Sequence, residues 1–266
     1  MRFVMISDVH GKYKKMIEAL VNVNFDKNKD TLVTVGDLFD RGEHSLEVLE
    51  FIMSCPNRIL LWGNHDMRLK RLLCGAAPSK TDYYNGVLET FQSFCGISNL
   101  RMIPVGISLL KSDATLFNVY RLLWDYFDEC VFAAEWDDLI ATHAWIPCVE
   151  RYINEKSYYL YKEDWRASNR DEWYEATWSN SFELLKNKVL PSKKLLIGHW
   201  HTFHFYEKIR GIQDNFDIFE DENIVAIDGC SNYKDGKVNV YIYENDSNPI
   251  LIQPQEKLSN AAEIVD

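Results

Sequence analysis

The chain has 266 residues, of which 47% are hydrophobic and 26% charged, so it can bury a large core and is not an intrinsically disordered protein. Its formal net charge is −11, and a field of that sign repels nucleic acids and anionic membrane surfaces, so we expect neither as a partner. Any anionic substrate must therefore be attracted by a local feature of the site.

Cysteine spacing and hydropathy bear on the compartment. The six cysteines show no CxxC spacing and no signal peptide precedes them, which indicates reduced thiols in a cytoplasmic protein. Charges interrupt every apolar run before it reaches the ~20 residues of a transmembrane helix. The sequence leaves the oligomeric state open.

The first seventy residues alternate between strand and helix patterns. Short apolar runs predict strands at 3–6, 31–35 and 58–62, and apolar positions at helical spacing predict helices at 13–20, at 45–53 and from residue 67 onwards. Alternation of this kind is typical of an α/β layered fold, in which ligands gather at the carboxyl ends of the strands.

The remainder contains two stretches that look inserted. Residues 67–135 are predicted to be a mostly helical cap, and residues 150–190 form an aromatic-rich insertion. Further strands are predicted at 138–142, 194–197, 224–227 and 238–243, with a hairpin turn at 234–236. We therefore expect one domain over residues 1–254 and a loose tail at 255–266.

Each predicted strand of the alternating region is followed at once by a polar, glycine-containing loop. These loops and two later ones carry carboxylates, an amide and five of the seven histidines, in the segments Ser7-Asp8-Val9-His10-Gly11, Gly36–Gly42, Gly63–Asp66, Thr142-His143 and Gly198–His201. One histidine after a strand is usually an ordinary polar residue. Five at strand ends favour a metal centre, and mixed oxygen and nitrogen ligands suit Mn, Fe or Zn better than Mg or Ca.

The order of these blocks resembles a known family. DxH, GD, GNH(D/E), H and GHxH are the blocks of the calcineurin-like metallophosphoesterases, and all five are present in order. The resemblance implies a layered β-sandwich flanked by helices. The strings GDLFDRG and Ala226-Ile227-Asp228-Gly229-Cys230 are similar to the phosphoprotein phosphatase branch, which includes bacterial and phage serine/threonine protein phosphatases and symmetrical diadenosine tetraphosphatases.

The resemblance also implies a ligand set. Two divalent ions, most in keeping with Mn and with Fe or Zn as alternatives, would be held by Asp8, His10, Asp37, Asn64, His143, His199 and His201. Asp37 would bridge the two ions. His201 belongs to the GHxH pattern of the wider family, whereas the protein phosphatase branch has GHT, so its role as a ligand is open.

Catalytic roles follow from the same resemblance. Two ions would activate a bridging water for in-line attack on phosphorus, and His65, oriented by Asp40, would protonate the leaving group. Arg41 would bind two phosphate oxygens, or else pair with Asp40. A second phosphate-binding arginine is expected between His143 and His199, and we choose Arg166. Trp62 occupies the position at which the branch commonly has a phosphate-contacting arginine.

The predicted activity is hydrolysis of phosphomonoesters, on a phosphoprotein or a small phosphorylated molecule. The alternative is hydrolysis of dinucleoside polyphosphates, as in diadenosine tetraphosphatases, and a phosphodiesterase or nuclease and a non-catalytic scaffold are further options. Aromatic residues between Tyr152 and Trp178 could stack a nucleobase or cradle a phosphotyrosine ring, or could pack the insertion onto the body. Cys230 has no activating partner in the sequence and is interpreted as structural.

Overall fold

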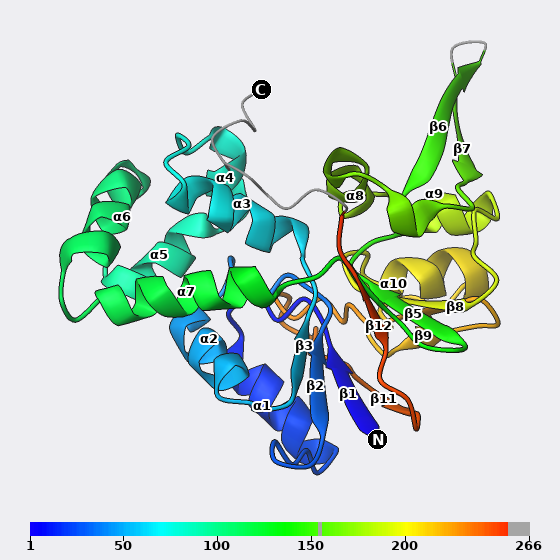
Figure 1. The fold of residues 1–266 in the computed structure, drawn as a ribbon, viewed down its shortest axis with the longest axis horizontal. Coiled ribbons are helices and arrows are strands. Elements are labelled where there is room, and N and C mark those ends of the chain that lie inside the picture. The colour runs from blue at the N-terminus through cyan, green and yellow to red at the C-terminus, as the bar shows by residue number, and fades with distance from the viewer. Residues whose placement is uncertain (154–155, 255–266) are drawn as a thin grey trace.

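The computed structural model describes residues 1–153 and 156–254 and shows two stacked β-sheets with helices around them (Figure 1). The first sheet has the order β11-β1-β2-β3. Its strands are β1 (Arg2–Ile6), β2 (Thr31–Thr34), β3 (Arg58–Leu60) and β11 (Val240–Glu244). Strands β1, β2 and β3 are parallel, and β11 pairs antiparallel with β1.

The second sheet has six strands in the order β12-β4-β5-β8-β10-β9. Its strands are β4 (Ala133–Glu135), β5 (Leu139–Thr142), β8 (Lys194–Ile197), β9 (Phe219–Glu220), β10 (Ile224–Ala226) and β12 (Ile250–Ile252). Strands β5, β8 and β10 are parallel to one another, and the other three pair antiparallel with their neighbours.

The two sheets pack face to face through alternating residues of their strands. In β1, Phe3 and Met5 join a buried cluster with Ala141 of β5 and Leu196 of β8, whereas Val4 and Ile6 join the cluster formed with the helices. Successive side chains of a strand point to opposite faces, so an unbroken apolar run is what a strand covered on both faces requires. The layered α/β sandwich predicted from the sequence is confirmed.

Helices α1 (Tyr13–Asn22) and α2 (Ser45–Met53) cover the outer face of the four-stranded sheet. In α1, Met16 and Leu20 are four residues apart and are both buried, so one stripe of the helix faces the sheet. The polar remainder of the helix faces solvent. These two helices fall where the sequence predicts them.

The predicted cap at 67–135 is helical for most of its length. It contains α3 (Asn64–Leu73), α4 (Lys80–Tyr84), α5 (Val87–Cys95), η1 (Leu100–Met102), α6 (Ile103–Ser112) and α7 (Phe117–Glu129). Its last residues differ from the prediction, because Ala133–Glu135 form β4 of the six-stranded sheet. Trp62 is buried at the base of this region and stacks on Phe127 of α7, with ring centroids 5.6 Å apart.

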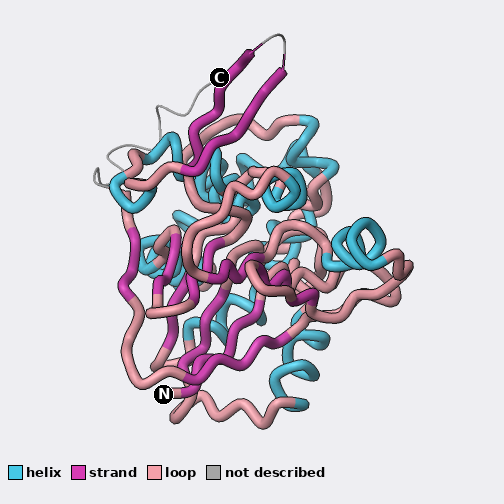
Figure 2. The backbone as a smooth tube through the Cα atoms, turned by 90° about the vertical axis from the view of Figure 1, so that its right-hand side faces the viewer, coloured by secondary structure: helices cyan, strands magenta, loops and turns pink. Residues whose placement is uncertain are grey.

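The aromatic-rich insertion contains a hairpin that the sequence analysis did not predict. Strands β6 (Cys148–Ile153) and β7 (Lys156–Tyr161) pair antiparallel and extend beyond the body of the molecule (Figure 2). Behind them come η2 (Trp165–Ala167), α8 (Arg170–Ala176) and α9 (Ser181–Lys186). Trp165 and Trp173 are fully buried, so these two rings pack the insertion onto the body.

The hairpin turn predicted at 234–236 is wrong. Residues 231–235 do form a turn, but β10 before it lies in the six-stranded sheet and β11 after it lies in the four-stranded sheet. The segment between β10 and β11 therefore crosses from one sheet to the other. Earlier in the chain, α10 (Thr202–Phe205) and η3 (Tyr206–Arg210) link β8 to β9.

Three further expectations concern the whole chain. All six cysteines are free thiols. None of the helices in the described part of the chain has the length and apolar character needed to cross a membrane. The tail predicted at 255–266 lies outside the described residues.

Candidate metal centre and active site

Five strands deliver polar residues to one edge of the sandwich. In the four-stranded sheet, β1 leads to Asp8, β2 to Asp37 and β3 to Asn64. In the six-stranded sheet, β5 leads to His143 and β8 to His199. Carboxyl ends of parallel strands share one edge of a sheet, and stacking the two sheets brings both edges together.

The loops at this edge, which we call the rim, are bonded to one another through their backbones. The amides of Asp8 and His10 donate to the carbonyls of Gly36 and Asp37, each at 3.1 Å, and the Gly198 amide donates to the His143 carbonyl at 2.8 Å. Six rim residues have a positive φ, from 48° to 67°: Asp8, His10, Asp37, Asp40, Arg41 and His199. Such backbone costs about 1–3 kcal/mol per residue and concentrates at functional sites.

One potential ligand group lies where the two sheets meet. The donor atoms of Asp37, His143 and His199 lie within 4.8 Å of one another. Asn64 belongs to the same group, because its Oδ1 lies 2.9 Å from His143 Nε2 and 3.0 Å from His199 Nδ1. Two sheets thus contribute to one cluster.

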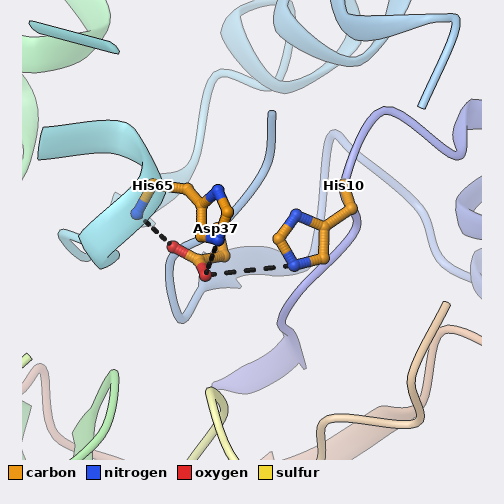
Figure 3. Close-up of side chains that lie close together, drawn as sticks. All are labelled: His10, Asp37 and His65. Atoms are coloured by element: carbon orange, nitrogen blue, oxygen red, sulfur yellow. Dashed lines mark hydrogen bonds and ion pairs between the residues drawn. The ribbon is translucent and has the colours of Figure 1, made fainter. Parts of the chain in front are cut away.

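A second group lies beside it and shares Asp37. The donor atoms of His10, Asp37 and His65 lie within 4.8 Å of one another, with both imidazoles directed at the Asp37 carboxylate (Figure 3). Asp37 Oδ2 is 3.9 Å from His10 Nε2 and 3.4 Å from His143 Nε2, so one carboxylate faces both groups. Asp8 Oδ1 completes this side at 4.0 Å from His10 Nε2.

The ring orientations fit metal ligation. His10 Nδ1 bonds to the Phe39 carbonyl at 2.8 Å and His143 Nδ1 to the Val35 carbonyl at 2.7 Å. A carbonyl only accepts, so each Nδ1 donates its proton there, and each Nε2 is the ring atom turned toward Asp37, where a cation would replace any proton that Nε2 carries. Ligating histidines are commonly oriented by such a bond from the second ring nitrogen. The donor set can therefore hold two cations that share Asp37.

The charges of the cluster also favour the binding of cations. Burial disfavours a charged imidazole at His143, but the Asp37 carboxylate outweighs this effect and raises the pKa of His143 to about 10. Burial also opposes ionisation of Asp37, yet the imidazoles of His143 and His65 hold its pKa well below its usual range. At Asp8, burial and the nearby Asp228 carboxylate raise the pKa. Buried carboxylates that lie this close together are stabilised when the positive charge of metal ions is added beside them.

His65 stands between Asp40 and Arg41. Its Nδ1 lies 2.7 Å from Asp40 Oδ2, and the Arg41 guanidinium lies 3.1 Å from its Nε2. A guanidinium only donates, so Nε2 accepts and Nδ1 donates its proton to Asp40. Before Nε2 can give a proton to a leaving group, Arg41 must turn away from it, and a bound phosphate provides that alternative partner.

Asp66 is a supporting residue to which the sequence analysis gave no role. Its carboxylate accepts the amides of Asp37 at 2.8 Å, Gly63 at 3.0 Å and Leu38 at 3.3 Å, and so fastens the second loop to the third. Burial and the Asp37 carboxylate raise the pKa of Asp66 to about 7. The fit is tight, because a Cβ on Gly63 would lie 2.2 Å from the Asp37 amide nitrogen.

The cap reaches the same loops through α5. Thr90 Oγ1 accepts the Asp40 amide at 2.8 Å and donates to Asp40 Oδ1 at 2.8 Å. The Gly86 carbonyl accepts the Arg41 amide at 3.1 Å, and a Cβ at Gly86, whose φ is 78°, would lie 2.4 Å from that nitrogen. The cap therefore holds the residues beside His65 in place.

Asp228 is a further buried rim residue. No role was predicted for it from the sequence, although it lies in the motif at 226–230 that resembles the phosphoprotein phosphatase branch. Burial raises the pKa of Asp228 to about 7, and the carboxylate lies 3.6 Å from His201 Nε2. Ser231 Oγ, three residues later, donates to the Asp8 carbonyl at 2.6 Å. Burial and Asp228 raise the pKa of the Cys230 thiol to about 12, which fits a structural cysteine.

Two predicted residues lie away from the ligand groups. His201 reaches the rim through Asp228 and belongs to neither group of donor atoms. Arg166 binds Glu135 of β4 through two contacts of 2.5 Å. In the pairing of β4 with β5, Glu135 lies opposite Ile140 and Ala133 opposite Thr142, so Glu135 is on the side away from the His143 loop. Arg166 is therefore engaged by Glu135 in this structure, and its role in phosphate binding stays a prediction.

Comparison with known proteins adds the following. Residues 1–242 match the family model for calcineurin-like phosphoesterases. A symmetrical bis(5'-nucleosyl)-tetraphosphatase from Proteus mirabilis is 49% identical over 103 residues, which are 38% of this chain and 38% of that protein. One from Coxiella burnetii is 45% identical over 85 residues, or 32% and 28%. The aligned stretches thus span 38% and 28% of the length of these two relatives.

A solved structure described as a "putative diadenosine tetraphosphatase" superposes with a TM-score of 0.51 and covers 96% of this chain and 95% of that one. Its sequence identity is 16%, so the likeness concerns the fold. The match over nearly the whole of both chains agrees with the sandwich and flanking helices described above.

Proposed function

Because the chain belongs to the calcineurin-like phosphoesterase family, we propose that it hydrolyses phosphomonoesters, either on a phosphoprotein or on a small phosphorylated molecule. The observation that carries this proposal is the row formed by Asp40, His65 and Arg41. His65 lies within the second donor group, but Asp40 and Arg41 engage both of its ring nitrogens, so we assign it to proton transfer and not to ligation. The ions would be held by Asp8, His10, Asp37, Asn64, His143 and His199. With its mixture of nitrogen and oxygen donors, this set suits Mn best, with Fe or Zn as alternatives.

The protein's own residues then have separate tasks. When bound, the two ions supply a nucleophilic water at neutral pH and neutralise phosphate charge. The guanidinium of Arg41 leaves His65 and grips two oxygens of the terminal phosphate. Nε2 of His65, freed by Arg41, takes up the proton that the attacking water gives up and passes it to the leaving oxygen, while Asp40 keeps the ring in the required orientation through Nδ1.

The presence of a proton donor favours, as the substrate, an ester whose leaving group is strongly basic. An alkoxide, such as the serine oxygen of a phosphoprotein, is strongly basic and leaves only with a proton. A nucleoside diphosphate released from a phosphoanhydride is weakly basic and leaves without one. A buried carboxylate that orients His65 at 2.7 Å is therefore most useful for alkyl phosphomonoesters.

A second candidate is symmetrical hydrolysis of dinucleoside tetraphosphates. It is favoured by the relatives that align with about a third of this chain, which are symmetrical bis(5'-nucleosyl)-tetraphosphatases. The same cations and Arg41 would serve a phosphoanhydride, and His65 would contribute little to the rate.

The test compares His65→Asn on three substrates with manganese added. For phosphoserine we expect kcat to fall by about 10²- to 10⁴-fold, the usual value of a general acid. For p-nitrophenyl phosphate and diadenosine tetraphosphate, whose leaving groups are weakly basic, we expect a loss of about tenfold or less. His44→Asn is the matched control, because the His44 side chain bonds to Glu47 and lies outside the ligand groups.

Equal losses on all three substrates would remove His65 as the proton donor. Wild-type turnover of diadenosine tetraphosphate alone would establish the second candidate in place of the first. Metal analysis of the purified protein, with two ions per chain expected, checks the centre independently of activity.

A further inference from the structure

A cavity of about 470 Å³ lies on the cap, between α4 and the segment that begins α6. Its lining includes Lys80, Tyr83 and Tyr84 from α4, together with Arg101 and Pro104. Pockets that hold small molecules have volumes of this size. None of these residues belongs to the ligand groups of the rim.

The charge of this cavity contrasts with that of the whole molecule. The chain carries a net charge of −11, yet the charged residues lining the cavity are Lys80 and Arg101. Neither cation takes part in an ion pair between described residues. The acidic neighbour, Asp82, is bound on its other side by Arg68 at 2.8 Å and Arg71 at 2.9 Å. The two cations are thus available to an anion from solution.

Two aromatic rings stand beside these cations. Tyr83 is 57% exposed and Tyr84 81% exposed, and their ring centroids are 5.6 Å apart in an edge-to-face arrangement. A ring next to a cation can stack a planar group while the cation binds its phosphate.

We propose that this cavity binds a nucleoside phosphate, with its base stacked on the more exposed ring, Tyr84, beside the edge-to-face ring of Tyr83, and its phosphates on Lys80 and Arg101. The site lies beside the catalytic loop, because Tyr84 is two residues from Gly86, whose carbonyl accepts the Arg41 amide. The proposal goes beyond hydrolysis at the rim, since binding here requires neither metal nor turnover.

The experiment measures ADP binding to the whole protein by calorimetry in the presence of EDTA, which removes any contribution of metal ions. Lys80→Ala/Arg101→Ala should weaken binding by about tenfold or more, because two charge-assisted contacts are lost. Lys14→Ala/Arg121→Ala is the matched control, since it removes the same charge from two exposed side chains elsewhere. Tyr84→Ala should also weaken binding, and adenosine and inorganic phosphate should each bind more weakly than ADP.

Asp37→Asn separates this proposal from the proposed activity. ADP binding that survives Asp37→Asn but is weakened in the Lys80→Ala/Arg101→Ala variant supports the cavity even if no phosphomonoester is hydrolysed. The proposal is overturned if ADP does not bind, if the cavity variant binds as tightly as the wild type, or if inorganic phosphate binds as tightly as ADP. Binding lost only in Asp37→Asn would place the ligand at the rim and equally overturn it.

Discussion

The rim and the insertions hold their polar side chains in different ways. At the rim, side chains bond to the backbones of neighbouring loops: His10 to Phe39, His143 to Val35, and Asp66 to three amides. In the insertions, side chains pair with one another, as in Arg166 with Glu135 and Lys162 with Glu172. When a side chain bonds to a backbone group, its orientation follows from the fold itself. When two side chains pair, their orientation depends on the identity of both residues. The ligand groups are therefore positioned by the sandwich, whereas Asp40 beside His65 also depends on contacts from the cap.

The largest effect is expected from Asp37→Asn, because Asp37 faces both ligand groups. Asparagine keeps the oxygen that accepts the His65 amide, at 2.9 Å, but removes the charge that the cations share. We expect bound metal to fall below two ions per chain and kcat to fall about 10³-fold or more, since the cations contribute several kcal/mol to the transition state. Metal analysis and steady-state kinetics measure the two effects.

Asp137→Asn, at an exposed position, is the control for that change and should leave both quantities as in the wild type. If Asp37→Asn retained two ions and full activity, the rim would not be the metal centre, and the contrast between the two regions would lose its basis.

A smaller effect is expected where the cap meets the rim. Thr90→Val preserves the shape of the side chain but removes both contacts with Asp40. The loss of about 1–2 kcal/mol should lower kcat on phosphoserine about tenfold and leave the bound metal unchanged. Thr81→Val, at an exposed position of α4, is the matched control. A loss of metal together with activity would show that the cap also supports the ligand groups.

Much of the centre could be predicted because each part is local in sequence. Asp8, Asp37 and Asn64 each follow an apolar run within a few residues, and parallel strands then bring those strand ends together. Asp66 and Thr90 were missed for the opposite reason. Their partners lie 29 and 50 residues away, and nothing local marks a carboxylate or hydroxyl as the acceptor of a distant amide.

The wrong hairpin and the unforeseen pairing of Arg166 have the same origin. The residues at 234–236 have the composition of a turn, but turn chemistry does not specify which sheets the flanking strands join. Arg166 was chosen for its interval in the sequence, and its actual partner, Glu135, became identifiable only when β4 was found in the six-stranded sheet. The fold and the positions of the ligand loops could thus be predicted from the sequence. Contacts between distant segments could not, because they depend on how the strands are arranged in three dimensions.

The smallest effect on catalysis is expected from Glu135→Gln, which alters a buried ion pair in the insertion. Burial alone would raise the pKa of Glu135, but Arg166 and Lys193 outweigh it and lower that pKa. The pair therefore stabilises the folded state at pH values above the unfolded pKa of about 4.3, and this stabilisation is lost as the pH falls through the folded pKa. Glu135→Gln should cost about 1–3 kcal/mol at pH 7, because Arg166 is partly exposed, and progressively less below pH 4. Urea unfolding of both proteins at pH 7, 5 and 3 measures the difference.

KM and kcat on phosphoserine should stay within about twofold of the wild type for Glu135→Gln and for Arg166→Met, since changes in this pair act on stability and not on the centre. A stability difference independent of pH would contradict the ion pair, and a raised KM in Arg166→Met alone would return Arg166 to the phosphate site.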